Sequence, residues 1–311
     1  MTTSVARPAT ARSAAVSRPR SRWGATVAAG PWLLPALVLI LAVVVFPAIY
    51  MVWVSTRNIS EFGVDRGAAG LDNYRRLVEF DAIGQVLTNT VLWVVGVVVV
   101  TVLVSLALAQ FLDKAFPGRR LVRLAVIVPW AASVVMTSTV FVYGLDPFYG
   151  VINRFLVDVG ILGEPYGFTQ RPVSAFLVSM AIAVFVSLPF TTYTLLAGLS
   201  AIPGEILEAA QVDGASPAAA YRRVVLPMLR PALAVATIIN IINVFNSLPI
   251  LRTITGSLPG YDADTTTTLT FKLIQTDRQI ATASALSVVN FALVLVVIAV
   301  YLRVVRPMRE D

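Results

Sequence analysis

Residues 82–112 read AIGQVLTNTVLWVVGVVVVTVLVSLALAQFL and contain no Asp, Glu, Lys or Arg. A helix needs about 20 mostly apolar residues to cross a bilayer whose hydrocarbon core is about 30 Å thick. This stretch is longer than that minimum, so it predicts one membrane-spanning helix. Five other windows lack charged residues over a length sufficient for a span: 23–56, 124–145, 172–204, 231–251 and 279–302.

Together these six windows predict an all-α, polytopic membrane protein with six transmembrane helices. The composition agrees, because 57% of the 311 residues are hydrophobic, 13% are charged and the mean hydropathy is +0.81. Soluble domains are about 45–50% apolar and about 25% charged, so a soluble globule is excluded. We expect one transmembrane domain over 31–311, with helices near 31–54, 88–111, 122–144, 174–198, 229–251 and 282–304.

The segment that precedes this domain has a different composition. Residues 1–30 are rich in Ala, Ser, Arg, Pro and Thr and show no apolar period, which predicts a disordered basic tail. The first apolar window is not a secretory signal peptide, because it is too long, lacks a clear cleavage site and is followed by five further spans.

The Lys and Arg residues predict the orientation. With the N-terminus inside, the inner segments carry 15 of the 24 Lys and Arg residues and the outer segments carry nine. The acidic residues are distributed in the opposite way, six inside and eleven outside, so the inner side is +9 and the outer side −2, which sums to the net +7. Because cytoplasmic loops are enriched in Lys and Arg, both termini are predicted to be cytoplasmic. Topology therefore explains the basic charge, and no nucleic-acid partner is expected.

Several kinds of chemistry are excluded by residue types that the sequence lacks. It contains neither Cys nor His, which excludes disulfides, Ser-His-Asp triads and His-containing zinc sites. Neither Lys114 nor Lys272 follows a glycine, so the G-K-[ST] phosphate loop of ATPases is absent. We expect no catalytic residue, no metal and no cofactor in this chain. The predicted spans also lack a charged residue near their centres, which argues against a proton-coupled carrier but leaves sodium coupling open.

The predicted loop at 199–228, between the fourth and fifth spans, is more than a connector. Residues 202–217 read IPGEILEAAQVDGASP, which predicts two short helices separated by a break. Pro203 suits a helix start, Gly214 a left-handed stop, and Ser216 an N-cap before a proline. Such a hairpin at the membrane surface is either a docking element or an interfacial structure without a partner.

This loop resembles the signature of the permease subunits of bacterial ABC importers: E-A-A, three residues, Gly, nine residues, then Ile-x-Leu-Pro. Val224 replaces the Ile, and the other matching residues are Glu208, Ala209, Ala210, Gly214, Leu226 and Pro227. In that family the loop is a coupling helix seated in a cleft of the ATPase subunit. The resemblance implies that these residues couple the chain to a separate ATPase, which binds ATP and Mg²⁺.

The resemblance extends over about residues 31–306 and points to the sugar-type branch, which includes maltose and glycerol-3-phosphate permeases. Residues Gly70–Tyr74, Thr88-Asn89-Thr90 and Gly150-x-Ile152-Asn153 look typical of that branch. It implies a multi-pass protein of the bacterial cytoplasmic membrane, in contact with lipid, that forms half of a translocation pathway. The implied partners are a second, different permease subunit, two ABC ATPase subunits, and an extracytoplasmic solute-binding protein that is a lipoprotein.

A stripe of polar residues is the candidate solute pathway. Asn240, Asn243, Asn246 and Ser247 recur at spacings of three and four along the fifth predicted helix, and Asn290 lies in the sixth. Amide and hydroxyl groups both donate and accept hydrogen bonds, which suits a neutral polyol. The same residues could instead hold helices together, since membrane bundles use interhelical hydrogen bonds.

The function predicted from these features is ATP-driven import of a carbohydrate, either an oligosaccharide or a sugar derivative, delivered by an external binding protein. Three alternatives stay open at this point. They are a secondary, ion-coupled solute carrier, an ABC permease for a non-sugar solute, and a membrane enzyme, for which the sequence supplies few acid–base residues.

Overall fold

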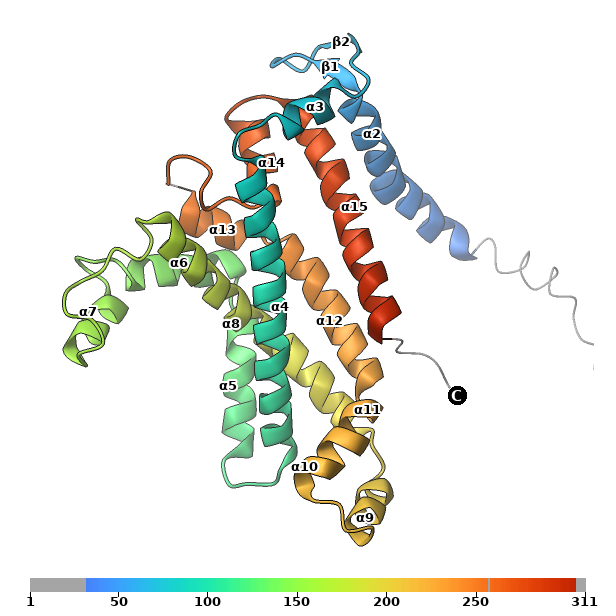
Figure 1. The fold of residues 1–311 in the computed structure, drawn as a ribbon, viewed down its shortest axis with the longest axis vertical. Coiled ribbons are helices and arrows are strands. Elements are labelled where there is room, and N and C mark those ends of the chain that lie inside the picture. Colours follow the sequence, from blue (N-terminus) through green and yellow to red (C-terminus); the bar gives the residue numbers. More distant parts are fainter. Residues whose placement is uncertain (1–31, 257, 306–311) are drawn as a thin grey trace, which may run out of the picture. The chain divides into compact units, whose positions relative to one another are not determined.

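The computed structural model describes residues 32–256 and 258–305, and Figure 1 shows its helices and strands. The chain divides into two compact units, Met1–Tyr50 and Met51–Asp311. The expected tail at residues 1–30 lies outside the described residues. Within the described part of the first unit the chain is helical, and one turn, η1 (Leu41–Val45), is a π-helix. The helix continues as α2 (Phe46–Ser55).

Four described helices are long and apolar enough to cross a membrane, and the number rises to six if each of two bent helix pairs counts as one span. The protein is therefore all-α in class. The four long helices are Trp32–Ser55, α4 (Ile83–Asp113), α8 (Pro172–Ser200) and α15 (Ile280–Val305). Trp32–Ser55 matches the expected range 31–54 over its described residues, and α4, α8 and α15 each begin and end one to five residues beyond theirs.

The residues expected to form one helix at 122–144 form two helices, which together have the length and apolarity of a single, bent span. α5 (Arg119–Ala131) and α6 (Val134–Gly144) meet at 96°. Ala132 and Ser133 both adopt extended backbone, which ends one helix and starts the next. The bend lays α6 against α8 and α13 (Leu248–Thr255), where apolar side chains of α6 join the core.

The helix expected at 229–251 is also broken, and α12 (Arg230–Phe245) ends six residues earlier than expected. Pro249 explains the break: it has no N–H to donate to the Phe245 carbonyl, and its ring would clash with that carbonyl in a continuous helix. Asn246 and Ser247 form the break, and α13 begins at Leu248. At its other end α12 is bent by 66° from the helical residues Pro217–Met228.

The segments that connect the long helices on the predicted outer side contain short elements. β1 (Arg57–Ile59) and β2 (Asp65–Ala68) form an antiparallel hairpin, followed by α3 (Asp72–Val78). α7 (Val151–Asp158) and α14 (Thr266–Gln275) follow α6 and α13. The hairpin carries an ion pair in which the Arg57 guanidinium lowers the pKa of the Asp65 carboxyl.

Asparagines from the family-like motifs anchor these short elements to the spans. Asn73 donates from its amide to the carbonyls of Ser55 and Arg57, at 2.8 and 2.9 Å. Asn153 donates to the carbonyls of Leu145 and Tyr166. A buried side-chain amide that bonds two backbone carbonyls fixes the path of two chain segments at once. These motif residues therefore have a structural role.

A third asparagine, Asn89 of α4, anchors the segment that leads into α14. Its amide donates to the carbonyls of Asp262 and Asp264, at 2.8 and 3.0 Å. The Asp264 carboxylate is 2% exposed and pairs with Lys272 at 2.6 Å. The ring of Tyr261 lies beside this pair, and burial, together with the charges of Asp277 and Asp264, raises its pKa.

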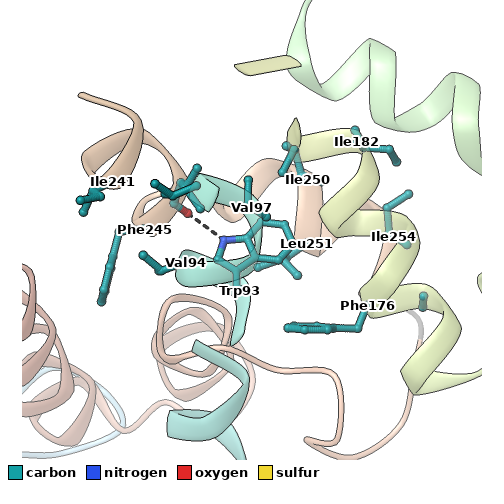
Figure 2. Close-up of a cluster of buried hydrophobic side chains, with 14 residues drawn as sticks. Trp93, Val94, Val97, Phe176, Ile182, Ile241, Phe245, Ile250, Leu251 and Ile254 are labelled. Carbon is teal, nitrogen blue, oxygen red and sulfur yellow. Dashed lines mark hydrogen bonds between the residues drawn. The ribbon is translucent and has the colours of Figure 1, made fainter. Parts of the chain in front are cut away.

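The main apolar core lies where α4, α8, α12 and α13 meet, and Figure 2 shows it around Trp93. Trp93 is 1% exposed, its ring is 5.8 Å from that of Phe176, and its indole N–H donates to the carbonyl of Val244 at 2.8 Å. Many large apolar side chains elsewhere on the long helices are exposed. That pattern fits a protein whose surroundings are lipid or further subunits.

Candidate functional site

The loop at 199–228 is a helical hairpin. α9 (Gly204–Val212) is followed by a turn at Asp213–Ser216 and then by α10 (Pro217–Ala220). Gly214 has φ +77°, the left-handed conformation that its position in the sequence predicts. The Ser216 hydroxyl accepts a hydrogen bond from the Ala219 N–H and caps α10. The chain then passes through a π-helical turn, η2 (Tyr221–Val225), and α11 (Leu226–Met228).

The signature-like residues occupy both arms of this hairpin. Glu208 and Ala209 are exposed on α9, and Ala210 is half-buried. Gly214 is exposed in the turn, whereas Leu226 and Pro227 are half-buried in α11, next to α12. No residue of α9 is buried, and Val212 at its end is 87% exposed. The hairpin thus offers a free helical surface, with its second arm joined to a span.

The polar stripe faces a hollow of about 480 Å³ between α5, α6, α8, α12 and α13. Asn240, Asn243, Asn246 and Ser247 all line it, although only the first two lie on α12 and the other two form the break after it. The spacing of three and four residues correctly predicted that these four side chains lie together. Although Asn246 and Ser247 follow the end of α12, they still line the same hollow. None of the residues that line this hollow is charged.

Asn240 is the least accessible residue of the stripe. It is 2% exposed, yet neither its amide nitrogen nor its amide oxygen has a hydrogen-bond partner. Leaving a buried donor or acceptor unpaired costs about 1–3 kcal/mol. Asn240 lines the hollow, and its amide retains both a donor and an acceptor that no other described residue uses.

Two aromatic side chains that the sequence analysis did not single out line the same hollow. Trp130 of α5 and Phe190 of α8 have ring centroids 6.4 Å apart. Thr191 of α8 also lines it, while its neighbours Thr192 and Tyr193 do not. No sequence signal singled out Trp130, because it lies inside the apolar window 124–145 among other apolar residues. Only the 96° bend after α5 places it beside the stripe.

Asn290, the remaining candidate, lies apart from the other four. It lines a second hollow of about 610 Å³, with Ser287 and Thr267 among its polar neighbours. Its amide oxygen is buried without a partner. Asn246 lines both hollows, so the break between α12 and α13 separates them. Among the described residues no cluster of acidic side chains has the arrangement of a metal site.

The fold and these features define a helical membrane transport subunit. Residues 101–310 match the model of the binding-protein-dependent transport system inner membrane component, and the chain belongs to this family. It is an ABC transporter permease, a non-catalytic, multi-pass subunit of the inner membrane.

Individual relatives agree with this assignment. A probable ABC transporter permease of Brucella suis biovar 1 (strain 1330) is 30% identical over 88% of this chain and 94% of its own length. The trehalose/maltose transport system permease MalF of Thermococcus litoralis is 30% identical over 89% of this chain and 93% of its own. A chain of a bacterial alginate ABC transporter, crystallised with an alginate-bound periplasmic protein, has the same fold, with TM-score 0.79, 20% identity, and coverage of 94% and 99%.

Proposed function

We propose that this chain forms half of an ATP-driven import pathway for a carbohydrate, an oligosaccharide or a sugar derivative, delivered by an external binding protein. The observation that carries the proposal is the buried, unpartnered amide of Asn240 on an uncharged hollow. Asn243, Asn246 and Ser247 add polar groups, and Trp130 and Phe190 add ring surfaces against which the C–H groups of a sugar can pack. The hollow, at about 480 Å³, is within the usual range for ligand sites.

A neutral solute fits this lining better than an ion. A buried charge needs an opposite charge or several hydrogen bonds, and the lining of this hollow supplies no charged side chain. The second hollow extends the pathway to Asn290, across the break at Asn246. Transport of maltose or trehalose is the function that the name of the Thermococcus relative gives, which supports the same solute class.

The hairpin at 199–228 is, in this proposal, the contact with the ATPase. Glu208, Ala209 and Ala210 on the unburied helix α9 would occupy a cleft of the ATPase, and Gly214 would set the angle between the two arms. Leu226 and Pro227 join the hairpin to α12, whose far end carries the polar stripe. Movement of the hairpin could therefore reach the solute pathway through one helix. ATP and Mg²⁺ would bind in the ATPase.

The complete importer would contain a second, different permease subunit, two ATPase subunits and an extracytoplasmic binding protein, which is a lipoprotein. Both termini of this chain, including the basic tail at residues 1–30, would be cytoplasmic, and residues 31–311 would form the transmembrane domain. The excess of Lys and Arg on the side of the 199–228 hairpin supports this orientation.

Uptake by the reconstituted complex tests the function. The chain is co-expressed with the proposed ATPase, second permease and binding protein, and the complex is placed in proteoliposomes. We expect ATP-dependent accumulation of a labelled neutral disaccharide or trisaccharide from a panel that also holds glycerol-3-phosphate, an amino acid and sulfate. Uptake driven by a sodium gradient without ATP would overturn the importer, and ATP-dependent uptake of only a charged compound would overturn the solute class.

A further inference from the structure

The break between α12 and α13 leaves two backbone carbonyls without their helical donors. In a continuous helix the Phe245 carbonyl would accept from the N–H of residue 249, but Pro249 has none. The Val244 carbonyl would accept from Leu248, whose N–H instead bonds the Asn246 carbonyl at 2.8 Å. In a membrane, a backbone group without a partner costs several kcal/mol, so both carbonyls need other donors.

Side chains from two other helices supply these donors. The hydroxyl of Thr267, in α14, donates to the Phe245 carbonyl at 2.9 Å. The indole N–H of Trp93, in α4, donates to the Val244 carbonyl at 2.8 Å, the bond drawn as a dashed line in Figure 2. The Val244 carbonyl also receives the Ser247 N–H at 3.2 Å. The last turn of α12 is therefore attached on one side to α4 and on another to α14.

We propose that Trp93 and Thr267 are positioning residues for the solute pathway. By bonding the two freed carbonyls they hold the last turn of α12 and the break in one conformation, and thereby direct Asn243 and Asn246 toward the hollow. Trp93 lines neither hollow. Thr267 lines the second hollow, but its hydroxyl donates to the Phe245 carbonyl, and this bond, rather than a contact with the solute, gives it the positioning role. This inference rests on the proposed function in one respect, the contact of Asn243 and Asn246 with the solute. The hydrogen bonds that hold the last turn of α12 do not depend on any solute.

The absence of cysteine makes a direct test of the attachment available. Val244→Cys places a single, nearly isosteric thiol at a position that is 2% exposed, and its backbone carbonyl still accepts from Trp93. A small methanethiosulfonate reagent should label this thiol only when the last turn of α12 opens. Val97→Cys, on α4 in the same core and fully buried, reports general loosening of the bundle.

Both reporters are labelled in the full-length chain within its importer complex, in membrane vesicles. Thr267→Val removes the hydroxyl but keeps the shape of the side chain. We expect the rate of labelling at residue 244 to rise about fivefold, because the loss of one ordinary hydrogen bond shifts a local opening equilibrium by about that factor. Labelling at residue 97 should not change, and Thr267→Ser should restore the slow rate. Thr255→Val is the control, because that buried hydroxyl donates within its own helix, to the Leu251 carbonyl.

Trp93→Phe, which keeps an aromatic ring but loses the N–H, should act in the same direction and is assessed only at residue 244, because position 97 is one turn away. The proposal is overturned if Thr267→Val leaves labelling at residue 244 unchanged, or raises it equally at residues 244 and 97. In a cysteine-free chain, Thr267→Val should raise the KM for maltose uptake and leave kcat nearly unchanged. If the parent complex transports neither maltose nor any other carbohydrate of the panel, the proposed solute class is wrong, while the labelling result still decides the positioning role.

Discussion

At the scale of single residues, Asn240 carries the most information about function. Its amide is buried and unpaired in a chain that satisfies most other buried polar groups, including Asn73, Asn89 and Asn153. An asparagine that joined helices of this chain would resemble those three and bond a neighbouring segment. Asn240 instead lines the hollow, and its amide makes no hydrogen bond to the described residues.

This difference gives a prediction for Asn240→Leu. The substitution removes an unpaired buried amide and keeps a similar volume, so the melting temperature of the complex should stay the same or rise. Uptake of the transported sugar should fall about tenfold, corresponding to about 1.4 kcal/mol of lost interaction. Transport and thermal unfolding of the same purified complex measure both effects. Lower stability with normal uptake would show that Asn240 joins helices. The control is Ser179→Ala, which removes a buried hydroxyl that bonds within its own helix.

At the scale of elements, the hairpin at 199–228 depends on the conformation of one glycine. Gly214 has φ +77°, and no atom lies within 4 Å of the place that a Cβ would occupy. A larger residue would therefore meet no clash, but its backbone would be strained by about 1–3 kcal/mol, most of all for a β-branched residue. The angle between α9 and α10 is thus set by backbone conformation rather than by packing.

Gly214→Val should accordingly change the angle of α9 and uncouple the ATPase. We expect the ATPase activity that the loaded binding protein stimulates to fall at least about tenfold, because the strain is relieved by reorienting α9. Gly204→Ala is a matched control, since Gly204 lies in the same hairpin with open space around it and no positive φ. Normal stimulated activity in an assembled Gly214→Val complex would contradict the coupling role.

At the scale of the whole molecule, the prediction concerns orientation. Ser216→Cys and Glu61→Cys place single thiols at exposed positions, in the 199–228 hairpin and in the turn between β1 and β2. An impermeant maleimide applied to intact cells should label residue 61 and not residue 216, because the positive side of the chain stays in the cytoplasm. Residue 216 should react once the membrane is permeabilised. The reverse pattern would invert the topology.

The all-α membrane class and four of the helices could be predicted from the sequence, because a charge-free run of this length is stable only in hydrocarbon or a buried core. The turn at Gly214 and the cap at Ser216 were also predictable, since they depend on local backbone preferences. The family could be inferred because its signature is a set of residues at fixed separations within one loop. All of these features are encoded by residues close together in the chain.

Only the tertiary structure shows the bend between α5 and α6, the break after Phe245 and the hollow to which both contribute. Pro249 could have suggested the break. The carbonyls that the break leaves without helical donors are bonded by Trp93 and Thr267, which lie 151 and 22 residues away from their carbonyl partners. Pairings across such separations leave no period in the sequence. Residues near in sequence determined the helices and their caps, whereas packing between distant helices decided which polar groups remain free for a solute.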